Sequence, residues 1–258
     1  MVAIVSRLAR QSFLGSQSGQ ILASSTVGII GLGGGGSHVV QQLSHLGIGN
    51  FVLCDPDFIS STNTNRLVGG TLNDVKAMVL KIDIARRIIS GLEPTAAVSA
   101  FAADWKNHLT HLRACDIIVS AVDSLKEKAD IEKFCRRYLI PLIDIGMTIT
   151  RTPDGYLISG QVIRSSNGMP CFRCLGFLTD DKIAREEARY GDSGDNPQVV
   201  WSNGVLASAA VGMAVRQLTP WNSGESNSYL VYDGNAGTVT RSKILEEIIE
   251  TRCAHHPY

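Results

Sequence analysis

The chain has 258 residues, 44% of them hydrophobic, which is enough for one large α/β domain with a substantial core. Its 24 basic and 24 acidic residues leave no net charge, so nothing in the composition favours a nucleic acid or an anionic membrane as a partner. No apolar run reaches the length of a signal-peptide core or a membrane span, and we expect a cytoplasmic protein. Six cysteines do not make a disulfide scaffold in a chain of this size.

Residues 1–20 carry a weak helical pattern that breaks at Gly15 and Gly19, so we predict an N-terminal arm. The remaining residues, 21–258, are predicted to form a single domain. Its nucleotide-binding half covers about residues 21–146. Its second half, residues 147–258, combines antiparallel strands, a cysteine knuckle and a crossover segment.

The nucleotide-binding half begins with a β-α-β unit. An apolar strand at 27–31 leads into a G-x-G-x-x-G turn made by Gly31, Gly33 and Gly36, and a helix and a second strand at 51–55 follow. Glycine permits the tight turn at the first position, close approach to phosphate oxygens at the second, and close packing of helix on strand at the third. The second strand ends on Asp55, where an acid can accept hydrogen bonds from ribose hydroxyls. Taken alone, this pattern favours NAD.

The elements that follow extend one sheet. We predict a helix from near Lys76 to Ile89, strands at 97–101, 116–121 and 140–145, and a helix at 124–139 between the last two strands. Beyond Gly146 come an antiparallel strand at 156–163 and a polar crossover segment at 176–197. A helix at 199–218, strands at 229–232 and 238–240 and a helix at 243–250 complete the chain. The predicted fold is therefore a Rossmann-like, doubly wound, mostly parallel sheet that antiparallel strands extend.

A polar loop after the second strand makes the pattern more specific than a dinucleotide fingerprint. With this loop, the chain resembles the ThiF/MoeB/HesA family of ubiquitin-activating-type adenylating enzymes from about Arg10 to its C-terminus. The matching residues, besides the three glycines, are Asp55, Asp57, Asn63, Arg66, Lys76, Asp123, Cys171 and Cys174.

The resemblance implies ATP in place of NAD. Such enzymes join a carboxylate, usually the Gly-Gly end of a small ubiquitin-like or sulfur-carrier protein, to the α-phosphate of Mg·ATP. In this chain, Arg66 and Lys76 would neutralise the growing charge, Asn63 would bind the phosphates and Asp123 would hold Mg²⁺. Arg10 resembles an arginine that reaches the neighbouring subunit's active site, which implies a homodimer.

Two assignments have competitors. Lys81 is an alternative to Lys76, and Asp123 could merely cap the helix that begins near Ser124. The C-x-x-C spacing of Cys171 and Cys174 suits a zinc knuckle. The family completes this site with a second C-x-x-C, which this chain lacks. We predict that Cys253 and His256, or else His255, replace it.

The nature of the activated carboxylate stays open. A peptide C-terminus or a threonylcarbamoyl-modified tRNA could replace the carrier protein, although the neutral charge balance makes a nucleic acid the less expected partner. An NAD-dependent oxidoreductase is the alternative from another class. The crossover segment contains no cysteine, so we expect no stable thioester there.

Overall fold

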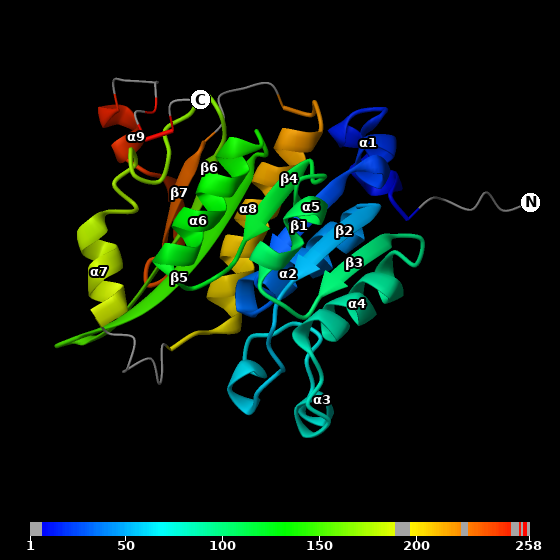
Figure 1. Cartoon of the computed structure of the whole chain (residues 1–258), viewed down its shortest axis with the longest axis horizontal. Helices are drawn as coiled ribbons and strands as arrows, with labels where there is room; N and C mark the ends of the chain where they lie inside the picture. Colours follow the sequence, from blue (N-terminus) through cyan, green and yellow to red (C-terminus); the bar gives the residue numbers. More distant parts are fainter. Residues whose placement is uncertain (1–6, 189–196, 223–226, 249–252, 254, 257–258) are drawn as a thin grey trace, which may run out of the picture.

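The computed structural model describes residues 7–188, 197–222, 227–248, 253 and 255–256, which build one mixed sheet with helices on both faces (Figure 1). Its strands lie in the order β3-β2-β1-β4-β5-β6-β7-β8. Pairing is parallel from β3 through β5 and antiparallel from β5 to β8, which confirms the predicted fold class. The strands are β1 (Thr26–Ile30), β2 (Asn50–Cys54), β3 (Ala97–Phe101), β4 (Ile117–Ser120), β5 (Leu142–Thr152), β6 (Gly155–Ser165), β7 (Tyr229–Asp233) and β8 (Thr238–Arg241).

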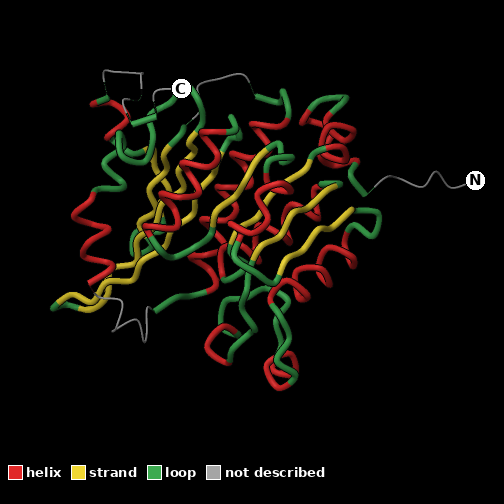
Figure 2. Tube along the Cα trace, in the orientation of Figure 1, coloured by secondary structure: helices red, strands yellow, loops and turns green. Residues whose placement is uncertain are grey.

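The helices cover the sheet because the strands are apolar on both faces. In β1, Val27 and Ile29 pack in one buried cluster with α2, α4 and α8, whereas Ile30 packs in another with α5 and α6. Figure 2 shows these helices as red tubes around the yellow strands. The helices are α1 (Ser18–Ser24), α2 (Gly34–Leu46), α3 (Leu72–Lys76), α4 (Lys81–Leu92), α5 (Leu109–Leu112), α6 (Leu125–Arg137), α7 (Asp180–Ala188), α8 (Val200–Leu218) and α9 (Ile244–Glu247), with short 3-10 helices η1 (Ala9–Leu14), η2 (Ser61–Asn63) and η3 (Trp105–His108).

The glycine turn between β1 and α2 has the predicted geometry at its two ends. Gly31 has a φ of +87°, in the left-handed region that favours glycine. At Gly36, a Cβ atom would lie 1.9 Å from the carbonyl oxygen of Gly31, so only glycine lets α2 approach the turn. The helix ends at Leu46, and Gly47, with a φ of +84°, forms a left-handed cap.

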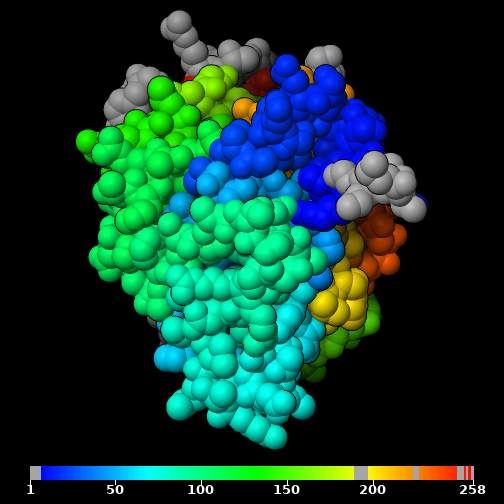
Figure 3. Space-filling model, turned by 90° about the vertical axis from the view of Figure 1, so that its right-hand side faces the viewer, coloured from blue at the N-terminus to red at the C-terminus, as the bar shows by residue number. Residues whose placement is uncertain are grey.

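Two segments differ from the sequence-based prediction. The helix expected from near Lys76 is two helices, α3 and α4, separated by Met78 with a φ of +49°. Residues 57–80 therefore form a finger, closed at its base by a bridge between Phe58 and Leu80, that projects from one end of the molecule (Figure 3). The crossover segment contains a helix, α7, that its polar sequence did not indicate. No helix in the described ranges is both long and apolar enough to cross a bilayer.

The close contact at Gly36 predicts a large loss of stability on Gly36→Ala. The new methyl group collides with a backbone carbonyl that cannot move away, and we expect the free energy of unfolding to fall by about 3 kcal/mol. Gly212→Ala, in α8, is the matched control, because beyond its chain neighbours and the backbone of its own helix nothing lies within 4 Å of the position that its new Cβ would take. We expect this variant to be neutral or stabilised by up to about 1 kcal/mol. Chemical denaturation of both variants measures the difference, and equal stabilities would contradict the prediction.

Candidate active site

A pocket opens at the carboxyl ends of the parallel strands, where the N-terminus of α2 faces it. The first amide groups of a helix have no acceptor within the helix, and together with the helix dipole they favour an anion. The pocket is lined by Gly33, Gly34, Gly35, Asn63, Arg66, Lys81, Ala121, Asp123, Ile145, Gly146, Met147, Gln198 and Asn203. The structure thus brings together Gly33, Asn63, Arg66 and Asp123 from the predicted set, while Gly31 and Gly36 shape the turn beneath them.

The lysine in this pocket is Lys81 and not Lys76. Lys81 is the first residue of α4, and its ammonium lies 2.6 Å from the carboxylate of Asp57 and 3.7 Å from that of Asp55. Lys76 is exposed in the finger and does not line the pocket. The break at Met78 causes the difference, because it starts a new helix whose first residue lies beside the end of β2.

Asp55 is buried and joins the glycine turn to the finger. Its carboxylate accepts hydrogen bonds from the backbone amides of Leu32, at 2.6 Å, and Asp57, at 2.9 Å. Burial raises the pKa of Asp55, and the nearby ammonium of Lys81 opposes this shift. In this structure the carboxylate orders the backbone of the pocket, and its predicted contact with a ribose stays a prediction.

Arg66 and Asn63 belong to the η2 loop at the start of the finger. The guanidinium of Arg66 donates to the carbonyl of Thr62 at 2.6 Å and to the side chain of Asn65 at 3.0 Å. The side-chain oxygen of Asn63 accepts from the amide of Ser60. Asn65 also donates to the carbonyl of Gln198 at 2.9 Å, which joins the loop to the segment before α8. The loop is thus ordered by its own side chains, with Arg66 at the pocket.

Asp123 lies in the turn between β4 and α6, and it is exposed to solvent. The helix cap is Ser124, whose hydroxyl accepts from the amide of Glu127, so the alternative in which Asp123 caps the helix is wrong. The carboxylate of Asp123 forms no hydrogen bond or ion pair with another residue of the described ranges. An exposed carboxylate beside an anion-binding helix terminus is the type of ligand that Mg²⁺ prefers.

Two polar features that no sequence pattern indicated support the pocket. Lys128 is buried in α6 and donates at 2.8 Å to both oxygens of Asp144 and to the carbonyl of Ile145. Asn203 of α8 packs so closely on α2 that a Cβ atom at Gly34 would lie 2.7 Å from its side-chain nitrogen. Charged or amide residues in helices are usually exposed, so no pattern in the sequence distinguished these two.

Arg10 lies far from the pocket of its own chain. It is exposed in η1, and its neighbour Gln11 donates to the carbonyl of Leu46, at the C-terminal end of α2. The pocket faces the other end of this 13-residue helix, which is about 20 Å long. Any contact between Arg10 and a pocket would therefore have to be made with another subunit.

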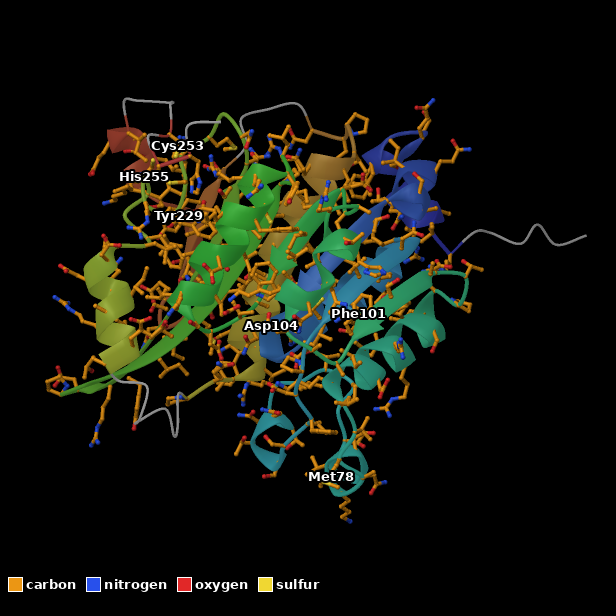
Figure 4. All side chains as sticks on the ribbon, viewed as in Figure 1. Met78, Phe101, Asp104, Tyr229, Cys253 and His255 are labelled. Carbon is orange, nitrogen blue, oxygen red and sulfur yellow. The ribbon has the colours of Figure 1, made fainter. Side chains whose placement is uncertain are left out.

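At the opposite end of the sheet, Cys171, Cys174, Cys253 and His255 form a cluster (Figure 4). The sulfur of Cys174 lies 3.5 Å from that of Cys171, 3.7 Å from that of Cys253 and 3.4 Å from Nδ1 of His255. Tetrahedral zinc, with bonds of about 2.3 Å to sulfur and about 2.05 Å to nitrogen, places two sulfurs about 3.8 Å apart and a sulfur and a nitrogen about 3.6 Å apart. The four side chains therefore fit a zinc ion.

The histidine that groups with all three cysteines is His255, the alternative, whereas His256 groups with Glu132 and Cys171. His256 lies 3.8 Å from the carboxylate of Glu132, a buried residue of α6. Glu132 in turn accepts from the amide of Phe172, inside the knuckle, at 2.9 Å. The two neighbouring histidines thus have separate positions, and the spacing of the sequence alone could not distinguish them.

Comparison with known proteins shows the family. A model of the ThiF family matches residues 5–252, so the chain belongs to the ThiF family. This membership favours the ATP-dependent alternative over an NAD-dependent oxidoreductase.

Individual relatives are named for different activities. The chain is 30% identical over 162 residues to a SAMP-activating enzyme E1 of Haloferax volcanii, covering 60% of this chain and 54% of the relative. It is 33% identical over 129 residues to a tRNA threonylcarbamoyladenosine dehydratase of Haemophilus influenzae, covering 48% of each. The chain thus spans about half the length of these relatives. A crystal structure of E. coli MccB with MccA-N7isoASN has the same fold, with a TM-score of 0.77 at 20% identity, covering 93% of this chain and 72% of MccB.

The geometry of the cysteine cluster predicts different results for the two histidines. We expect about one zinc ion per purified chain, and a content well below that after His255→Ala, because the site loses its nitrogen ligand. His256→Ala is the matched control, and it should keep its zinc. Elemental analysis of the purified proteins measures both. Equal zinc contents in the two variants would contradict the assignment, as would a well-folded, metal-free wild-type protein.

Proposed function

We propose that this protein is an ATP-dependent adenylyltransferase that activates the C-terminal carboxylate of a small ubiquitin-like or sulfur-carrier protein. The product would be an acyl adenylate, with release of pyrophosphate. The observation that carries the proposal is the position of Arg66, Lys81 and Asp123 in one pocket at the N-terminus of α2. Membership of the ThiF family supports it, and so does the name of the relative from Haloferax volcanii.

The pocket offers the groups that this reaction needs. Backbone amides of Gly33, Gly34 and Gly35 would bind phosphate oxygens at the helix terminus. Negative charge accumulates on the α-phosphate as the carboxylate approaches, and the cations of Arg66 and Lys81 would stabilise it. A carboxylate is already ionised at neutral pH, so the reaction requires positioning and electrostatic stabilisation but no general base.

Two metal ions would have separate roles. Asp123 would hold Mg²⁺, which neutralises the phosphates and prefers oxygen ligands. Zinc at the cysteine cluster would join the C-terminal segment to the knuckle and stabilise that end of the sheet.

The proposal also includes a homodimer in which Arg10 acts on the partner's pocket. The exposure of Arg10, and its position at the far end of α2 from its own pocket, support a role in trans.

A modified tRNA is the second candidate substrate, because one relative is named a tRNA threonylcarbamoyladenosine dehydratase. Its carboxylate would be activated by the same chemistry. The neutral net charge of the chain does not favour a polyanionic partner, and we therefore place the carrier protein first.

The position of Lys81 predicts its importance for catalysis. Lys81→Ala removes a cation from the pocket, and we expect the rate of ATP–pyrophosphate exchange to fall by about 100-fold. Lys76→Ala removes the same charge from the exposed finger and should change the rate less than about twofold. Similar losses in both variants, or a loss in Lys76→Ala alone, would contradict the assignment of Lys81.

The choice of substrate predicts which molecule stimulates the reaction. We expect a purified ubiquitin-like protein ending in Gly-Gly to stimulate ATP–pyrophosphate exchange, and the same protein without its last glycine to be inactive. Threonylcarbamoyl-modified tRNA is tested in parallel. Stimulation by the tRNA alone would make the tRNA the favoured substrate in place of the carrier protein. If neither molecule stimulates the exchange, both candidate substrates are rejected.

A further inference from the structure

Polar contacts join helix α7 to the rest of the chain at both of its ends. None of its nine residues is buried. At its start, Asp180 lies 2.7 Å from the guanidinium of Arg173, and the ammonium of Lys182 donates to the carbonyls of Gly176 and Phe177 at 2.8 and 3.1 Å. An isolated helix of this length is marginal in water. Its order therefore depends on the groups that hold its ends.

At its other end, α7 binds the turn that carries Asp123. The carboxylate of Glu186 accepts hydrogen bonds from the backbone amide of Leu125, at 2.8 and 3.0 Å, and from the hydroxyl of Ser124, at 3.2 Å. Glu187 forms an ion pair with Lys126 at 2.9 Å. The residues that bind Glu186 are the two that directly follow Asp123.

The carboxylate of Glu186 binds the N-terminus of α6, where a negative charge is favoured. Leu125 is the first residue of α6, a 13-residue helix, and its amide has no acceptor within the helix. A carboxylate at such a terminus is also favoured by the helix dipole. Ser124 gives its hydroxyl proton to Glu186 while its oxygen accepts from Glu127, so the same carboxylate orients the helix cap.

We propose that Glu186 is a positioning residue for Asp123. By binding Ser124 and Leu125 together, its carboxylate fixes the backbone of the turn, and the turn fixes where the Asp123 carboxylate points. The inference rests on the proposed function, because the benefit of a fixed Asp123 is a preformed Mg²⁺ ligand in the pocket. With this role for Glu186, helix α7 of the crossover segment would also contribute to the active site.

Glu187 provides a matched control, since the two glutamates are neighbours on one helix. The pair of Lys126 and Glu187 has side chains that are 65% and 51% exposed, and exposed ion pairs contribute little. Glu186 is less exposed, and its hydrogen bonds to the backbone are charge-assisted. Glu186→Ala and Glu187→Ala remove the same charge but different contacts.

The experiment compares both variants with the wild-type chain in two measurements. Hydrogen–deuterium exchange at the Leu125 amide reports directly on the contact, and we expect it to quicken by about tenfold in Glu186→Ala but not in Glu187→Ala. In ATP–pyrophosphate exchange, the Mg²⁺ concentration for half-maximal rate should rise by about tenfold in Glu186→Ala. Its kcat at saturating Mg²⁺ should change less than about threefold. Glu186→Gln keeps an acceptor and should recover part of both effects.

The outcomes separate this inference from the proposed function. An unchanged Leu125 amide in Glu186→Ala overturns the contact, whatever the enzyme catalyses. A quicker amide with an unchanged Mg²⁺ dependence, or equal effects from Glu187→Ala, overturns the positioning role while adenylation stands. A wild-type chain without any ATP–pyrophosphate exchange overturns the proposed function and the Mg²⁺ role together.

Discussion

The carboxylate of Asp55 is the group on which the geometry of the pocket depends. It accepts hydrogen bonds from the amide of Leu32 in the glycine turn and from the amide of Asp57 at the base of the finger. It also lies beside the ammonium of Lys81. Three segments that are distant in sequence thus meet at one buried group. A buried carboxylate is costly unless it is paired and hydrogen-bonded, so this arrangement of the three segments is strongly favoured over alternatives that leave Asp55 without partners.

The position of Lys81 illustrates how this constraint outweighs a local preference. A lysine at the first residue of a helix is disfavoured by the helix dipole. Here two carboxylates compensate, and the backbone amide of Lys81 also donates to the carbonyl of Asp57. A small buried cluster of Ile59, Leu67 and Ile84 holds the finger on α4. Such exceptions to local preference occur where function requires them.

The sequence predicted most of the fold, because apolar strands and the glycine turn leave strong local patterns. It also identified most of the charged residues that line the pocket. It offered Lys81 only as the alternative to Lys76, since the break at Met78 depends on a residue with positive φ that no turn motif indicates. Nor could it distinguish His255 from His256, which are neighbours in the sequence and have different partners in the structure. Helix α7 was missed because polar contacts order it, and hydrophobic periodicity cannot reveal such a helix.

The two candidate metal sites lie at opposite ends of the sheet, and α6 connects them. Lys128, Glu132 and Arg136 are all buried and recur every four residues along one face of this helix. Lys128 binds Asp144 and the carbonyl of Ile145 at the pocket, whereas Glu132 binds the amide of Phe172 in the knuckle.

Arg136 continues this row, donating to Ser165 and to the carbonyls of Met169 and Pro170, just before Cys171, the first cysteine of the cluster. A shift of α6 along its axis would leave several buried charged groups without partners, at a cost of about 3–5 kcal/mol for each broken pair. The helix therefore has one favoured position on the sheet. Because Asp123 lies two residues before α6, the position of this helix also constrains the turn that carries Asp123, whose direction we propose that Glu186 fixes.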